Sequence, residues 1–175
     1  MKKILITVDM QNDFIDGALG TPEAVSIVPA VREKILQYPR ENRYATMDTH
    51  GETYEKTQEG QHLPVRHCIR GTEGWNLTPQ IEELIPEENR ICKPSFGSEA
   101  LAEKMKQIAA SEEIEIELIG VCTDICVVSN AVLLKAALPE TRISVDPSCC
   151  AGTAPAMHEA ALQVMQSCQV DLAGK

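Results

Sequence analysis

Apolar positions along the chain form short, nearly continuous runs that alternate with longer, helix-like segments. Such runs are typical of parallel strands that are covered on both faces. They predict strands at residues 3–8, 43–47, 90–93, 114–119 and 142–145. The longer segments predict helices at residues 22–37, 98–110, 124–137 and 154–168. Because the two kinds of element alternate regularly, we expect an α/β fold with a doubly wound, Rossmann-like, mostly parallel sheet flanked by helices.

Residues 48–89 interrupt this alternation. The stretch is rich in Gly, Thr, Pro and Glu, and it contains three of the four histidines. A loop of this length inside a compact domain is usually functional. At 175 residues the chain has the length of one domain with a full hydrophobic core. We therefore expect a single domain over residues 1–175, with a functional loop region at 48–89.

The charge balance narrows the range of partners. The chain has 16 Lys and Arg against 26 Asp and Glu, a net charge of −10. No basic stripe is available to displace the counterions of a nucleic acid, so we expect no nucleic-acid partner. The start, MKKILITVDM, holds too short an apolar run for a signal peptide or a membrane span. Seven cysteines without a secretion signal indicate a reducing compartment, so we expect a cytoplasmic protein without a membrane partner.

Reactive and metal-binding side chains follow the predicted strands. In open α/β sheets, ligands bind outside the carboxyl ends of the strands. The residues at these ends are Asp9, Asp48 with His50, Lys93, and Cys122 with Cys126. We therefore expect an acid, a base, a nucleophile and two metal ligands along one edge of the sheet.

The two cysteines of GVCTDICV, at residues 120–127, have three explanations. A thioredoxin-type redox pair needs two residues between its cysteines, whereas three separate Cys122 from Cys126. A zinc site would need further ligands nearby, and residues 127–157 contain no histidine. What remains is a glycine-led turn from a strand into a helix, a place where α/β enzymes often carry a nucleophile.

Five motifs in a fixed order carry a resemblance to a known family. They are DMQNDF at 9–14, MDTH at 47–50, HC with IRGTEGW at 67–75, CKPSFGS at 92–98 and GVCTDICV at 120–127. With these motifs the chain resembles the isochorismatase-like cysteine hydrolases, and within them the nicotinamidase branch. In that family an Asp after the first strand, a Lys after the third and a Cys after the fourth form the catalytic triad. The resemblance assigns these roles to Asp9, Lys93 and Cys126.

The chemistry of the implied triad explains the residue types. A thiol with a pKa near ~8.5 is mostly protonated at neutral pH, so the nucleophile needs activation. The charge of Lys93 favours the thiolate, and the N-terminus of the helix that begins near Asp124 adds a smaller effect. Asp9 is expected to take the thiol proton and later deliver it to the departing amine.

The same resemblance implies an oxyanion hole. Its donors would be the backbone N–H groups of Cys122 and Cys126. In this family the peptide bond before the position of Cys122 is cis, which turns that N–H toward the site. We therefore expect Cys122 to contribute its backbone and its small size, and Cys126 to be the nucleophile.

The resemblance also implies a metal site. Asp48 and His50 are two residues apart at a strand end, so their side chains project to the same side. In the nicotinamidase branch such a pair and a later histidine, here His67, bind a divalent ion. Glu59 has the spacing of an additional acidic ligand that some members carry, although the same loop also offers other glutamates, Glu52 and Glu55. This ligand set suits zinc, with manganese or iron tolerated; the alternative is that both histidines only hydrogen-bond loop backbone.

The substrate pocket departs from the family pattern. Nicotinamidases carry an aromatic residue a few positions before the second metal-ligand histidine, where this chain reads HLPVRH with Leu63 or Pro64. Phe14 is expected to stack on a planar ligand, and Trp75 either faces the pocket or packs in the core. We expect Phe14, Leu63 and Trp75 to bind substrate.

Other polar residues and cysteines have structural interpretations. Thr21 and Thr123 are predicted N-caps of the helices that follow them. His62 and His158 are expected at the surface. The remaining cysteines are predicted to be structural thiols: Cys68, Cys92, Cys149, Cys150 and Cys168.

The leading function hypothesis is a metal-assisted cysteine amidohydrolase. It would cleave a small carboxamide through a thioester, with nicotinamide as the favoured substrate. One alternative is a metal-free relative that acts on isochorismate-type enol ethers or on ureido or carbamoyl compounds. Another is a non-catalytic thiol or ligand-binding protein, which would need neither Asp9 nor Lys93. The family commonly forms dimers or tetramers, so we expect a homodimer or homotetramer.

Overall fold

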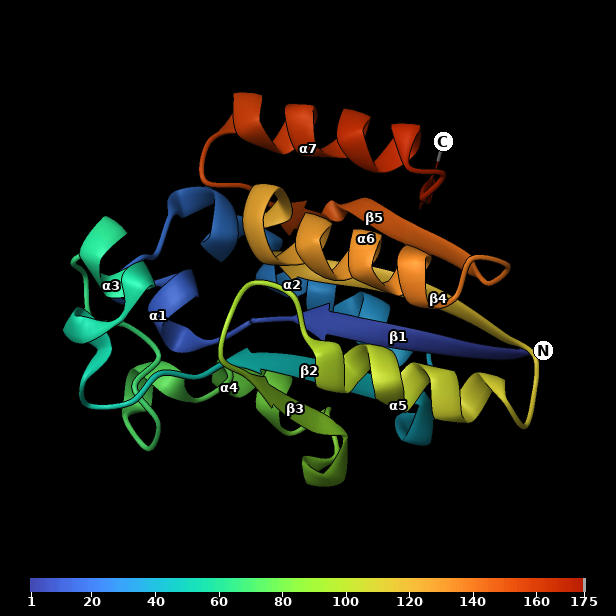
Figure 1. The fold of residues 1–175 in the computed structure, drawn as a ribbon, viewed down its shortest axis with the longest axis horizontal. Helices are drawn as coiled ribbons and strands as arrows, with labels where there is room; N and C mark the ends of the chain where they lie inside the picture. Colours follow the sequence, from blue (N-terminus) through green and yellow to red (C-terminus); the bar gives the residue numbers. More distant parts are fainter. Residues whose placement is uncertain (175) are drawn as a thin grey trace.

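A parallel sheet forms the centre of the computed structural model, which describes residues 1–174 (Figure 1). Within these residues the sheet has six strands in the order β3-β2-β1-β4-β5-β6, and all neighbours are parallel. The strands are β1 (Lys2–Val8), β2 (Arg43–Asp48), β3 (Arg90–Lys93), β4 (Ile114–Val121), β5 (Arg142–Ala151) and β6 (Asp171–Leu172). The order reverses direction between β1 and β4, which is where a doubly wound sheet binds its ligand. The predicted fold class is confirmed.

Helices cover both faces of this sheet. Figure 1 shows α5 and α6 in front of the sheet and α2 behind it. The long helices are α2 (Pro22–Leu36), α5 (Glu99–Ala109), α6 (Val128–Ala137) and α7 (Pro155–Ser167). Shorter helical segments are α1 (Asn12–Ile15), α3 (Gln58–His62), α4 (Pro79–Glu82), η1 (Arg40–Asn42), η2 (Tyr54–Lys56), η3 (Glu73–Trp75), η4 (Glu87–Asn89) and η5 (Thr123–Val127). In residues 1–174, none of the helices has both the length and the apolar character that a membrane span requires.

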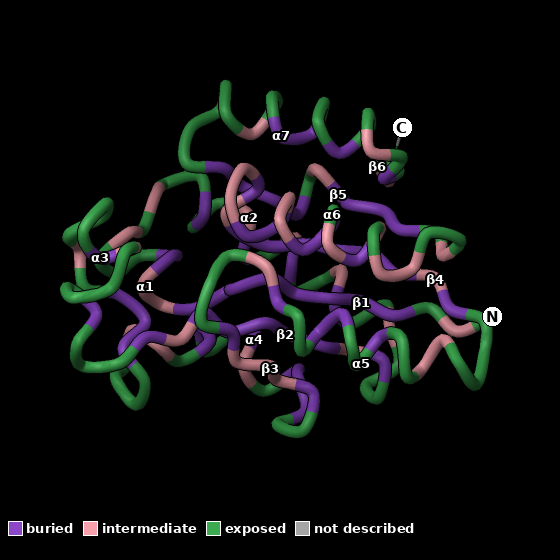
Figure 2. Tube along the Cα trace, viewed as in Figure 1, coloured by how far each residue is buried: buried purple, intermediate pink, exposed green. Residues whose placement is uncertain are grey.

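Two apolar clusters hold the layers together, and the central strand contributes to both. Ile4 and Ile6 of β1 pack in one cluster with residues of α5, α6 and α7. Leu5, which points to the opposite face, packs with α2 residues such as Val31 and Ile35. Figure 2 shows the four central strands, β2, β1, β4 and β5, buried along most of their length. This two-sided burial explains why the strand sequences are continuous apolar runs.

The predicted start of α2 is confirmed. The side chain of Thr21 accepts a hydrogen bond of 3.0 Å from the backbone N–H of Ala24, and Pro22 occupies the first helical position. The threonine thereby satisfies an N–H group that the helix itself leaves unpaired.

The close approach of β4 to β1 requires a glycine at position 120. Gly120 has a φ of +119° and lies opposite Val8 in the register, where an added Cβ would overlap the Val8 carbonyl oxygen. Changing Gly120 to Ala should therefore lower the free energy of unfolding by about 3 kcal/mol, because the new side chain has neither space nor a favourable φ. Urea titration would measure this, with Gly51→Ala as the control, since a Cβ at Gly51 meets nothing within 4 Å. Equal stabilities of the two variants would contradict the argument.

Candidate active site

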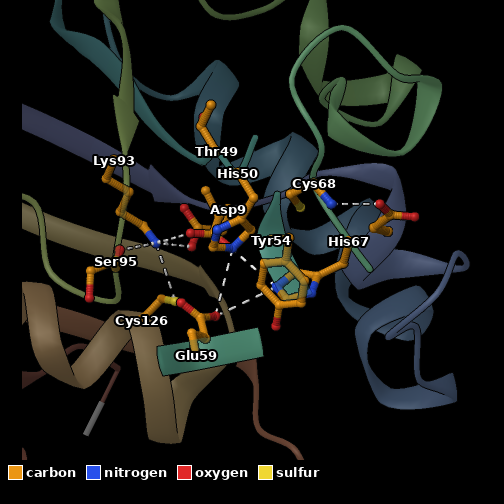
Figure 3. A network of polar contacts seen from close by, with 12 residues as sticks. Asp9, Thr49, His50, Tyr54, Glu59, His67, Cys68, Lys93, Ser95 and Cys126 are labelled. Atoms are coloured by element: carbon orange, nitrogen blue, oxygen red, sulfur yellow. Dashed lines mark hydrogen bonds and ion pairs between the residues drawn. The ribbon is translucent and has the colours of Figure 1, made fainter. Parts of the chain in front are cut away.

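Three strand ends bring Asp9, Lys93 and Cys126 together (Figure 3). Asp9 follows β1, Lys93 is the last residue of β3, and Cys126 lies in the η5 turn after β4. Lys93 Nζ lies 2.7 Å from Asp9 Oδ2 and 3.4 Å from Cys126 Sγ. All three residues are buried. The structure therefore joins the three residues that the resemblance assigned to a triad.

Lys93 is held as a cation in this cluster. Its Nζ also lies 3.3 Å from Asp48 Oδ1 and donates a 2.9 Å hydrogen bond to the Ser95 carbonyl. Burial alone would lower the pKa of Lys93, but the negative charges of Asp9 and Asp48 raise it above its usual value. The lysine is thus a fixed positive charge, and the proton acceptor of the cluster must be another group.

Asp9 has one oxygen fixed and one directed at the reacting groups. Its φ is +49°, a conformation that Asp adopts more readily than most residues. The hydroxyl of Thr46 on β2 donates a 2.6 Å hydrogen bond to Oδ1, while Oδ2 faces Lys93. Burial raises the pKa of Asp9, and the charge of Lys93 opposes this. A carboxyl group with a raised pKa is a better proton acceptor than an ordinary aspartate.

The pKa of the Cys126 thiol is raised well above its usual value. Burial is the main cause and the charge of Asp9 adds to it, whereas Lys93 acts in the opposite direction without prevailing. The charge of Lys93 thus favours the thiolate, as expected, but burial of the thiol opposes it. A thiol with a raised pKa needs a proton acceptor when it attacks, and a nearby carboxylate can serve as one.

The backbone around the nucleophile has an unusual local structure. The peptide bond between Val121 and Cys122 is cis, in agreement with the expectation from the family. Residues Thr123–Val127 form a π-helical turn, and regular α6 begins only at Val128. The carbonyl of Cys122 accepts hydrogen bonds of 3.1 Å from the N–H groups of Ile125 and Val127. The predicted helix over 124–137 is therefore α-helical only in its later part.

Two predictions for this turn are wrong. Thr123 does not cap the helix: Cys122 takes the N-cap position, and the buried Thr123 hydroxyl lies 2.8 Å from Nδ1 of His158. His158 is consequently a half-buried partner of the turn, not a free surface residue. Beside it, Asp124 accepts hydrogen bonds from the backbone N–H (2.8 Å) and the hydroxyl (2.6 Å) of Thr153. These two hydrogen bonds connect the η5 turn, which carries Cys126, to the loop between β5 and α7.

The sequence analysis missed two positioning residues, Asn130 and Gln11. Asn130 donates a 2.8 Å hydrogen bond to the carbonyl of Cys126, and its Oδ1 accepts one of 2.9 Å from the Ser98 N–H. Its position four residues after Cys126, on the same face of a helix, was the available signal. The side chain of Gln11 accepts a hydrogen bond from the N–H of Asp48 (2.7 Å) and donates one to its carbonyl (2.8 Å). It thereby fixes the end of β2 that carries Asp48.

Asp48, His50, Glu59 and His67 form a second cluster next to Lys93. One ligand atom from each lies within 4.8 Å of all the others. Asp48 Oδ2 is 2.9 Å from His50 Nε2 and 3.4 Å from His67 Nε2. Glu59 Oε1 is 3.7 Å from the first of these nitrogens and 3.8 Å from the second. The structure brings Glu59 to this cluster, whereas the alternatives Glu52 and Glu55 both pair with Arg66.

The donor set of this cluster fits a divalent cation. His67 Nδ1 hydrogen-bonds the Val65 carbonyl at 2.8 Å, which leaves Nε2 without a proton and free to bind a metal. Nδ1 of His67 thus hydrogen-bonds loop backbone, as the alternative in the sequence analysis expected, and Nε2 can still bind a metal. Although burial opposes it, the hydrogen bond from His50 and the charge of Lys93 hold the pKa of Asp48 below its usual range. Two nitrogens and two carboxylate oxygens at this distance form a ligand set that zinc accepts.

A cavity of about 290 Å³ joins the two clusters. It is lined by Phe14, Leu19, Thr21, Asp48, Glu59, Leu63, His67, Phe96, Cys122, Ile125, Cys126 and Thr153. Phe14 and Leu63 therefore lie where a substrate would contact them. The structure does not bring Trp75 to this cavity: its indole N–H donates a 2.9 Å hydrogen bond to the Thr49 hydroxyl, and its ring packs at the edge of the core.

The other cysteines lie outside the cavity lining. Cys68, Cys149 and Cys150 are buried, while Cys92 and Cys168 are partly exposed. His62, in agreement with expectation, is exposed. Of the seven cysteines, all within the described residues, only Cys122 and Cys126 line the cavity.

Fold and site together define an α/β enzyme with a buried Asp–Lys–Cys cluster beside a metal-binding group. The isochorismatase domain model matches residues 3–174, so the chain belongs to the isochorismatase family. PncA of Bacillus subtilis, described as an uncharacterized isochorismatase family protein, is 30% identical over 143 residues, which cover 75% of this chain and 78% of that protein. The nicotinamidase/pyrazinamidase of Mycobacterium tuberculosis is 25% identical over 183 residues, 97% of each chain.

A solved structure agrees with this assignment. The pyrazinamidase of Pyrococcus horikoshii, in complex with zinc, is similar with a TM-score of 0.79 and 27% identity over 99% of each chain. Family and relatives confirm the resemblance seen in the motifs. They make the chain a hydrolase that acts on linear amides, in the nicotinamidase-related branch of the family.

Proposed function

We propose that this protein is a metal-dependent nicotinamidase, which hydrolyses nicotinamide to nicotinate and ammonia through a thioester on Cys126. One observation carries the proposal: Cys126 and three members of the metal-binding group, Asp48, Glu59 and His67, line the same cavity. A substrate with a carboxamide and a ring nitrogen on one small ring would reach both at once. The nicotinamidase and pyrazinamidase relatives support this substrate class.

In the proposed acylation, Asp9 accepts the proton of Cys126 while the sulfur attacks the carboxamide carbon. The carbonyl oxygen becomes an oxyanion, which the backbone N–H groups of Cys122 and Cys126 stabilise. Asp9 then gives its proton to the nitrogen, the C–N bond breaks, and ammonia leaves. Lys93 keeps its charge throughout and stabilises the negative charge that moves between Asp9 and the sulfur.

In the deacylation, a water molecule attacks the thioester carbon. Asp9 accepts the proton of that water, and the thiol of Cys126 is regenerated when nicotinate leaves. Asp48, His50, Glu59 and His67 would hold the divalent ion, zinc by its ligand set, and such an ion would bind the ring nitrogen and orient the carboxamide. Phe14, whose ring centroid lies 5.5 Å from that of His67, would pack against the substrate ring.

Ammonia release from nicotinamide tests the proposal, with the protein as purified, after treatment with a chelator, and after zinc is restored. We expect release that falls at least about tenfold on metal removal and returns with zinc, since removing a metal that orients substrate costs positioning energy. Full activity of protein shown to be metal-free would favour the metal-free members of the family. Zinc-loaded protein that does not cleave nicotinamide would refute the proposed substrate.

Asp124 is expected to position the nucleophile through the Thr153 contacts. Asp124→Ala removes both hydrogen bonds, so kcat for nicotinamide should fall about tenfold with little change in KM, because the substrate does not touch Asp124. Asp124→Asn keeps an oxygen that can accept from the Thr153 N–H and should recover part of the loss. A matched change at Asp171, an exposed aspartate at the far side of β5, should leave kcat unchanged. Equal kcat values for the Ala and wild-type proteins would contradict this role.

A further inference from the structure

The cavity differs in character between its two ends. The inner end is buried and holds reactive and metal-binding side chains: Asp48, His67 and Cys126 are each less than 9% exposed. The outer end is open: Leu63 is 38% and Phe96 is 44% exposed. These two side chains are among the exposed large apolar residues of the described chain, and both are placed at the mouth of the same cavity.

The outer walls are largely apolar and carry no charge, and the hydroxyls of the two lining threonines, Thr21 and Thr153, are hydrogen-bonded within the protein. Leu19 comes from the loop before α2, Leu63 from the end of α3, Phe96 from the loop after β3, and Ile125 from the η5 turn. Among the residues that line the cavity, all within residues 1–174, the only ionisable side chains outside the cysteines are Asp48, Glu59 and His67, which belong to the metal-binding group. A charged group in the outer part would therefore lose its hydration without gaining a partner. An apolar group there would be removed from water on several sides.

The volume of the cavity exceeds what one ring needs. An apolar cavity of about 150 Å³ is large enough for a benzene molecule. The cavity here has about 290 Å³, so roughly half remains after a six-membered ring is placed at the inner end. One bound water takes up only about 30 Å³ of the remainder. A substrate without a substituent would leave the apolar mouth filled with water.

The direction of a substituent follows from the two inner clusters, and this step rests on the proposed function. In a pyridine-3-carboxamide, the ring nitrogen and the carboxamide flank carbon 2. If the nitrogen faces the metal-binding group and the carboxamide faces Cys126, carbon 2 is the innermost ring atom. Carbon 5 lies diametrically opposite and therefore points to the mouth, toward Leu63 and Phe96.

We infer that the preferred substrates of this enzyme are heteroaromatic carboxamides with an uncharged apolar substituent on the ring carbon that faces the mouth, as in 5-alkylnicotinamides. The alkyl group packs against Leu19, Leu63, Phe96 and Ile125. The enzyme selects among amides by this contact, while the inner clusters carry out the reaction on all of them.

The test compares kcat/KM for nicotinamide, 5-methylnicotinamide and 5-propylnicotinamide. Each buried methylene should raise kcat/KM by about fourfold, so the propyl compound should exceed nicotinamide by at least about tenfold even with incomplete burial. The same compounds are titrated against zinc-loaded Cys126→Ala protein to measure binding without turnover. A propyl compound that reacts and binds no better than nicotinamide would overturn the inference.

A matched pair of variants locates the contact. Leu63→Trp fills the mouth and should lower the propyl-to-nicotinamide ratio of kcat/KM by about tenfold. Leu36→Trp makes the same change at a leucine of α2 that is 47% exposed and lies outside the cavity lining, and it should leave that ratio unchanged. Equal ratios in Leu63→Trp and wild-type protein would contradict the assignment of the mouth.

The two proposals fail in different ways. Hydrolysis of nicotinamide without any gain from the propyl group would refute the substituent preference and leave the nicotinamidase activity intact. Tighter binding of the propyl compound with hydrolysis of neither amide would support the preference and refute the nicotinamidase activity.

Discussion

Replacing Cys126 with Ala should lower kcat for nicotinamide hydrolysis by at least about 10⁴-fold, because removal of an activated nucleophile eliminates the covalent route. The sulfur of Cys126 lies 3.4 Å from the Lys93 ammonium inside the buried cluster. A water molecule in its place would be a weaker nucleophile. Ammonia release, measured with zinc-loaded protein over several hours, would give the residual rate.

The matched control is Cys168→Ala. Cys168 follows α7, is partly exposed, and does not line the cavity, so its removal should leave kcat within about twofold of wild type, since substitutions away from a site have small effects. Circular dichroism would show that both variants are folded. A Cys126→Ala protein with more than a few per cent of wild-type activity would contradict the assignment of the nucleophile.

Replacing Asp9 with Asn should lower kcat by about 10³-fold, within the range that general acid–base groups contribute. The amide has nearly the same shape and can still accept from Thr46, but it cannot take the proton of Cys126. Asp9 and Asp48 are the two carboxylates whose charges raise the pKa of the Cys126 thiol, and Asp48 belongs to the metal-binding group, so Asp9 is the one available as a proton acceptor. The measurement is the kcat of the zinc-loaded variant.

The pH profile provides the second readout for Asp9. Its base form is required, so kcat/KM of the wild type should fall as the pH drops through the pKa of Asp9, and burial raises that pKa above the ordinary value for aspartate. The acid limb should therefore lie at a higher pH than for an ordinary aspartate, and it should be absent from the residual activity of Asp9→Asn. Asp16→Asn, a change of an exposed aspartate in the same segment, should keep both rate and profile. An unchanged acid limb in Asp9→Asn would assign the ionisation to another group.

Much of the site could be predicted because the sheet is parallel. The carboxyl ends of parallel strands meet at one edge, so residues far apart in sequence, such as Asp9, Lys93 and Cys126, could be placed together from the strand pattern alone. The polar residue directly after each apolar run was the signal. The strand β6 went unpredicted because two residues are too few to show a pattern.

What the sequence concealed lies in side-chain directions and in local backbone structure. Trp75 sits in a long loop without periodicity, and only the folded loop shows that its indole bonds to Thr49 and not to a ligand. Because of the π-helical turn, Thr123 does not occupy the expected N-cap position, and its hydroxyl contacts His158, which is distant in sequence. The sequence also could not show the pKa of Cys126. Whether burial or the charge of Lys93 has the larger effect depends on how deeply the thiol is buried, which a motif does not report.

The central claim is that Cys126 carries the acyl group during amide hydrolysis. Mixing zinc-loaded enzyme with nicotinamide, quenching in acid from the first turnover onward, and mapping peptides by mass spectrometry test it most directly, since thioesters survive acid. The account predicts one nicotinoyl group on the peptide that contains Cys126, and none on that peptide in Cys126→Ala protein. Ammonia release accompanied by a nicotinoyl group on a different residue would contradict it.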